Sequence, residues 1–179
     1  MAFTLLLAGC EALPLRQGEI PPRPAHAGIA AFSLDGRVAA RQEQTRHYAN
    51  IAWHHTDAAD DILLTTPLGQ GVAELIRDAG GARLVAADKQ AVAAADWEGL
   101  SARVFGFALP LAGMPHWLLG DVAATRRDDL GRPLAAVADG WDIRYLDYES
   151  PAADALPVLM EFRRDDIELR IKVDAWQLN

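Results

Sequence analysis

The sequence lacks several features that would define a function directly. It has one cysteine, Cys10, so no intramolecular disulfide and no cysteine-based metal site can form. It contains no phosphate-binding glycine loop, no Gly-x-Ser-x-Gly elbow and no His-Glu-x-x-His pattern. Basic residues are scarce, since 17 Lys and Arg stand against 25 Asp and Glu, for a formal net charge of −8. We therefore expect neither an enzyme nor a nucleic-acid-binding protein.

Long hydrophobic runs are also absent from the sequence. No stretch approaches the roughly 20 apolar residues that a membrane-spanning helix requires. The acidic balance disfavours electrostatic adhesion of the folded body to anionic lipid. Any contact between the body and a membrane is therefore expected to be apolar.

The single cysteine ends the sequence Leu7-Ala8-Gly9-Cys10, which follows a short apolar run. This pattern is typical of the lipobox of a bacterial lipoprotein, whose small residues admit a signal peptidase and whose thiol carries diacylglycerol. We expect residues 1–9 to be a truncated signal peptide, because no Lys or Arg precedes Cys10. The diacylglycerol and an N-acyl chain on Cys10 would be the only attached groups, with no other cofactor and no metal. The alternative is a short buried strand that ends in Gly-Cys.

The composition predicts one domain after a tether. Residues 10–30, expected to be the lipidated N-terminus and a flexible tether, are rich in polar and small residues and contain four prolines, Pro14, Pro21, Pro22 and Pro24. Residues 31–179 are long enough to form a single domain with its own core.

Alternating apolar and polar residues predict antiparallel strands in this domain. The alternation covers residues 32–38 and is clearest at 167–174. Residues 158–163 alternate as well, and a turn at 164–166 predicts a C-terminal hairpin. A further strand is expected over 141–145, after the turn signal Asp139-Gly140. The fold class is therefore mainly β.

The middle of the chain has helical rather than alternating periodicity. Asp96 can cap a helix over residues 97–105, and Gly106 can end it. A second helical segment is expected at 110–120, with the apolar stripe Leu111, Met114, Trp117 and Leu118. These helices either pack on the sheet as ordinary core elements or form a lid over a cavity.

Histidines and paired aspartates are the remaining candidates for chemistry. His54 and His55 are adjacent, so on a strand they face opposite sides of the sheet and cannot share one metal ion. We expect them to be solvated or locally hydrogen-bonded. Asp60-Asp61 and Asp128-Asp129 are interpreted as turn residues and edge charges.

A tight excursion follows a strand that ends in Thr65-Thr66. Pro67 and Gly69 flank a single Leu68, which places this leucine at the tip of a loop. Leu68 either folds back into the core or is exposed and enters a bilayer. Burial of one leucine is worth roughly 1.5–3 kcal/mol, enough to favour a transient membrane encounter.

Several motifs, taken together in this order and spacing, resemble the LolB family of outer-membrane lipoprotein receptors. The motifs are Gly36-Arg37-Val38-Ala39, the strand ending in Trp53, Leu63-Leu64-Thr65-Thr66-Pro67-Leu68-Gly69, Ala73-Glu74-Leu75, Leu109-Pro110-Leu111, Trp117-Leu118-Leu119-Gly120, Gly140-Trp141 with Tyr145 and Tyr148, and Leu169-Arg170-Ile171-Lys172-Val173-Asp174-Ala175-Trp176.

The resemblance implies an unclosed antiparallel β-barrel whose open side is covered by short helices around a hydrophobic cavity. It also implies a lipid-anchored monomer on the periplasmic face of the outer membrane. Such a protein accepts triacylated lipoproteins from the periplasmic carrier LolA and inserts them into the inner leaflet without nucleotide.

The resemblance also implies roles for specific residues. Pro67, Leu68 and Gly69 correspond to the family's protruding membrane-insertion loop, which favours exposure of Leu68. The candidates for lining the cavity are apolar and adaptable: Trp53, Met114, Trp117, Leu118, Trp141, Tyr145 and Met160. The alternative function is a structural or adaptor lipoprotein, which would have a filled core and bind a protein or cell-wall partner through its surface.

Overall fold

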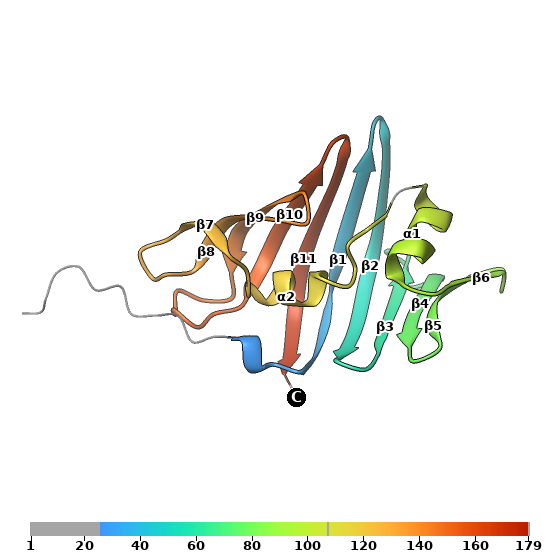
Figure 1. Cartoon of the computed structure of the whole chain (residues 1–179), viewed down its shortest axis with the longest axis horizontal. Helices are drawn as coiled ribbons and strands as arrows, with labels where there is room; N and C mark the ends of the chain where they lie inside the picture. Colours follow the sequence, from blue (N-terminus) through green and yellow to red (C-terminus); the bar gives the residue numbers. More distant parts are fainter. Residues whose placement is uncertain (1–25, 107, 179) are drawn as a thin grey trace, which may run out of the picture.

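A computed structural model describes residues 26–106 and 108–178 of the chain (Figure 1). Cys10, the predicted signal peptide and residues 10–25 of the predicted tether lie outside the described residues. The domain boundaries that we expect from the sequence therefore stay predictions.

The described residues form one antiparallel sheet, a 3-10 turn and two short helices. The helical elements are η1 (His26–Gly28), α1 (Trp97–Phe105) and α2 (Met114–Leu119). The strands are β1 (Ala31–Gln42), β2 (Thr45–Thr56), β3 (Asp60–Thr65), β4 (Gly71–Asp78), β5 (Gly81–Ala86), β6 (Ala91–Ala94), β7 (Ala124–Arg127), β8 (Pro133–Ala138), β9 (Trp141–Tyr148), β10 (Pro157–Arg164) and β11 (Ile167–Leu178).

The sheet is open, because its two edge strands do not pair. Its order is β6-β5-β4-β3-β2-β1-β11-β10-β9-β8-β7, so the first and last strands meet in the middle. A bulge interrupts the β1–β11 register next to Gly36. A Cβ atom at this glycine would lie 2.2 Å from the carbonyl oxygen of Lys172, so the close approach of the two backbones requires glycine.

One face of the sheet, called the inner face here, carries continuous rows of apolar side chains. One row crosses five strands through directly paired residues, Leu34, Trp53, Ile62, Leu75 and Leu84. Both helices lie over this face (Figure 1). The expected fold class, an unclosed antiparallel sheet with short helices, is confirmed.

The helices begin and end as their local sequences predict. The Asp96 side chain accepts a hydrogen bond from the Gly99 amide, and Gly106 closes α1 in the left-handed conformation. The second helix is shorter than the expected 110–120, because a turn occupies the residues before Met114 and Pro115 stands in its first turn.

The chain contacts the body of the domain from the first described residue. The His26 ring nitrogens lie 2.9 and 3.1 Å from the carbonyl oxygens of Leu119 and Asp154. The last part of the predicted tether is therefore attached to the end of α2. Among the described residues, no helix has the length and apolar character needed to cross a membrane.

Candidate functional site

The loop between β3 and β4 is a closed β-turn that holds Leu68 at its tip. The Gly69 amide donates to the Thr66 carbonyl at 2.8 Å, which places Pro67 second and Gly69 fourth in the turn. These are positions that the two residues favour. Thr66 and Gln70 close the base of the loop with a backbone hydrogen bond of 2.8 Å, and the Asn50 side chain donates to the Thr66 carbonyl at 3.0 Å.

Leu68 does not fold back into the core. Its side chain is 90% exposed, the most exposed of the large hydrophobic side chains in the described part of the chain. Hydrogen bonds at its base fix the turn, so the loop itself holds Leu68 in the exposed position. The Leu68 side chain is exposed, as the family resemblance predicts, whereas its role in membrane insertion stays a prediction.

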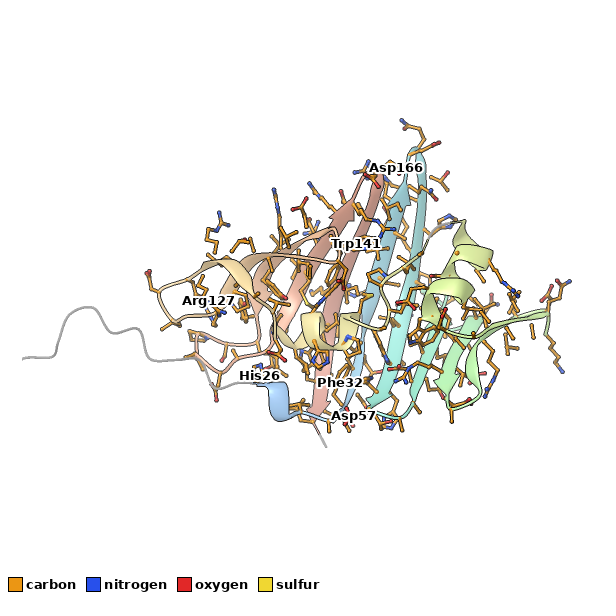
Figure 2. All side chains as sticks on the ribbon, in the orientation of Figure 1. His26, Phe32, Asp57, Arg127, Trp141 and Asp166 are labelled. Carbon is orange, nitrogen blue, oxygen red and sulfur yellow. The ribbon has the colours of Figure 1, made fainter. Side chains whose placement is uncertain are left out.

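The seven candidate cavity residues all lie in the buried apolar cluster formed by the sheet and the helices (Trp141 is labelled in Figure 2). The sheet contributes Trp53, Trp141, Tyr145 and Met160, and α2 contributes Met114, Trp117 and Leu118. The structure thus brings them together on the inner face. None of them lines the hollow beside Pro67 or the hollow beside Asp147, so their role in lining a cargo cavity stays a prediction.

Only a few polar contacts attach the helical layer to the sheet. The Tyr145 hydroxyl donates to the Trp117 carbonyl at 2.8 Å, which connects β9 to α2. Arg164 donates to the carbonyl of Ala108, in the segment between the helices, and its guanidinium lies 4.7 Å above the Trp141 ring. The Trp141 indole nitrogen is buried and has no hydrogen-bond partner among the described residues. These contacts join α2 and the segment before it to the sheet, while α1 makes polar contacts of its own with β3 and β6.

A buried carboxylate, Asp60, connects α1 to three strands of the sheet. It is 2% exposed and accepts hydrogen bonds from Trp53 Nε1 at 2.9 Å and His55 Nδ1 at 2.6 Å. Arg77 Nε donates at 2.6 Å, and Trp97 Nε1 of α1 donates at 3.3 Å. Burial raises the pKa of Asp60, but the hydrogen bonds from His55, Trp53 and Arg77 outweigh it and hold the pKa below its ordinary value.

The interpretation of Asp60 as a turn or edge charge is therefore wrong. Asp60 faces the inner side, where side chains of three other elements, β2, β4 and α1, converge on it, while its neighbour Asp61 is exposed. One sequence signal could have suggested this arrangement. On paired strands, Asp60 stands directly opposite His55 and Arg77, which both donate hydrogen bonds to it.

The other polar candidates are local structural groups. His54 hydrogen-bonds Ser33 Oγ at 2.8 Å on the face opposite to His55, as the strand geometry predicts. Asp128 closes its turn by accepting from the amides of Leu130 and Arg132. Its interpretation as a turn residue agrees with this geometry.

An open antiparallel sheet with an apolar inner face and two short helices over it is consistent with the LolA/LolB fold class. The family model described as "Outer membrane lipoprotein LolB" matches residues 30–176. The chain is 40% identical to the outer-membrane lipoprotein LolB of Nitrosomonas europaea, over 99% of this chain and 90% of the relative. It is 36% identical to that of Thiobacillus denitrificans, over 96% and 91%.

The chain belongs to the LolB family. This family consists of non-enzymatic outer-membrane receptors, anchored by lipid at the periplasmic face, that insert lipoproteins received from LolA. The predicted family, function and location are confirmed, and so is the expectation of LolA and acylated lipoproteins as partners.

Proposed function

We propose that the acyl chains of a lipoprotein enter the inner face beneath α1 and α2, and that the Leu68 loop then meets the bilayer that receives them. The chain would act as a monomer held by lipid on Cys10. The observation that carries the proposal is the 90% exposure of the Leu68 side chain on a loop closed at its base.

The inner face suits a mobile apolar ligand. An acyl chain gains about 0.8 kcal/mol for each methylene removed from water, so it needs an apolar enclosure during transfer. Met114, Met160 and Trp117 offer such surfaces, and methionine adapts its shape readily. The polar contacts between α2 and the sheet are few, which would ease separation of α2 from the sheet when a chain enters.

Transfer of cargo in one direction without nucleotide requires that the affinity for cargo increase at each step. Cargo would bind weakly to the carrier, more strongly here and most strongly to the bilayer. The lipid on Cys10 would raise the local concentration of the receptor at the membrane without taking part in transfer.

Entry of acyl chains can be tested by fluorescence quenching. We expect a lipopeptide with brominated acyl chains to quench the tryptophan emission of the full chain carrying Cys10→Ser, because Trp141 lies on the inner face and Trp117 packs on that face from α2. The same lipopeptide without bromine is the control. The variants Trp117→Phe and Trp141→Phe should each lose part of the quenchable emission.

Binding of the brominated lipopeptide without quenching would contradict the proposal. That result would mean that cargo binds at the outer surface, as an adaptor lipoprotein with a filled core would bind a partner.

A further inference from the structure

The face of the sheet opposite to the helices, called the outer face here, has a hollow of about 540 Å³ beside the Leu68 loop. Its walls come from β1, β2, β10, β11 and the loop residue Pro67. We call it the outer groove. The full lining is Arg37, Val38, Ala39, Tyr48, Ala49, Asn50, Pro67, Leu159, Arg170 and Lys172.

The outer groove contains cations and no acidic residue. Arg37 and Lys172 are paired directly across β1 and β11, and Arg170 is paired with Ala39 in the next row on the same face. The side chains of Arg37 and Arg170 are 56% and 49% exposed. The chain as a whole has a net charge of −8, whereas this hollow is lined by three cations and is locally positive.

Ion pairs within the chain do not neutralise all three cations of the outer groove. Arg37 binds Asp174 at 2.8 Å, and Arg170 lies 3.7 Å from Glu161, but neither carboxylate lines the outer groove. Lys172 forms no ion pair within the part of the chain that the structure describes. The charge of Lys172 interacts with that of Asp174 without a direct salt bridge, so an anion in the groove would meet a cation whose side chain is not bound to a carboxylate.

The charge also changes sign along the sheet. A second hollow of about 450 Å³ is lined by Asp147, Glu149 and Asp174 together with Lys172. Acidic side chains thus gather in the hollow beside β9 and the end of β11, while the hollow beside the Leu68 loop gathers cations. The distribution would direct an anion to the loop.

Apolar and aromatic groups border the cations of the outer groove. Tyr48 is 64% exposed, and Pro67 belongs to the same turn that exposes Leu68. A cationic hollow next to an apolar tip matches the sequence of layers in a bilayer, where phosphate groups lie outside acyl chains. Each Lys or Arg near an anionic membrane surface contributes to binding.

We propose that the outer groove binds the phosphate-bearing headgroup of an anionic membrane phospholipid while Leu68 enters the acyl layer. The inference rests on the proposed function, in which the loop meets the bilayer. It assigns Arg37, Arg170 and Lys172 to the headgroup and makes membrane contact partly electrostatic, which the net charge of the chain alone disfavours.

The test measures vesicle binding of the full chain carrying Cys10→Ser, so that no lipid is attached there. We expect stronger binding to vesicles of phosphatidylcholine with added phosphatidylglycerol than to phosphatidylcholine alone. The double variant Arg170→Gln/Lys172→Gln should lose about tenfold in the partition constant on the anionic vesicles and little on the neutral ones. The matched control is Arg126→Gln/Arg144→Gln, which removes two exposed cations outside the groove.

Three outcomes would overturn the inference. One is unchanged binding of the groove variant, and another is an equal loss in the control variant, which would indicate diffuse electrostatics. The third is displacement from vesicles by millimolar inorganic phosphate at constant ionic strength, which would assign the groove to free phosphate. A failure of the proposed function gives a different result, because Leu68→Glu would then bind neutral vesicles as well as the unsubstituted chain does.

Discussion

Replacing Leu68 with Glu should leave receipt of cargo intact and reduce its delivery to membranes by at least about tenfold. Burial of one leucine is worth roughly 1.5–3 kcal/mol, and a charged side chain in its place resists entry into the acyl layer. The side chain is 90% exposed, so the variant should fold with a free energy of unfolding within about 0.5 kcal/mol of the original chain. Both steps can be followed with a labelled lipoprotein, first on LolA and then in vesicles.

The matched control for this variant is Val137→Glu. Val137 is 57% exposed on β8 and lies outside the Leu68 loop. It should deliver cargo at the original rate. Delivery by Leu68→Glu at the rate of this control would contradict the membrane role of the loop.

Replacing Asp60 with Asn should lower the free energy of unfolding by about 3–5 kcal/mol at neutral pH. The substitution leaves the guanidinium of Arg77, which is 27% exposed, without its carboxylate, and loss of one member of a largely buried ion pair has up to this order of cost. It also turns an acceptor of four hydrogen bonds into a group with donors of its own. Chemical denaturation measures the change.

The effect of Asp60→Asn should depend on pH in one direction. The pKa of Asp60 is lowered in the folded state, so its charge stabilises the fold above the unfolded pKa of about 4. This stabilisation is lost as the pH falls through the folded pKa. The difference in stability between the variant and the original chain should therefore shrink below about pH 4.

The neighbouring substitution Asp61→Asn is the control for Asp60. Asp61 is exposed, so its replacement should change stability by no more than about 0.5 kcal/mol. A loss as large as that of Asp60→Asn would contradict the account of the buried cluster.

Elements with local signals could be predicted from the sequence. The helix over residues 97–105 is found with these bounds because Asp96 and Gly106 supply its cap and its end within a few residues. The alternation that defines β11 is equally local, since each polar residue stands next to its apolar neighbour. The local sequence leaves two alternatives for Leu68, burial in the core or exposure, and the family resemblance favours exposure.

Sites assembled from distant segments could not be predicted in this way. Asp60 has the sequence environment of an edge charge, and its role depends on Trp97, which is 37 positions away and arrives with a different element. The outer groove joins residues of β1 and β11 that are more than 100 positions apart. The net charge of the chain gives no sign of the outer groove, because a sum over all residues does not say where the charges lie.

The central claim is that this chain passes lipoproteins from LolA to a membrane without an energy source. The most direct measurement follows a labelled triacylated lipoprotein from purified LolA to phospholipid vesicles in the absence of nucleotide, with and without the chain carrying Cys10→Ser. The account predicts that vesicle-bound lipoprotein rises only when the chain is added. Cargo that stays on LolA with the folded chain present would contradict it.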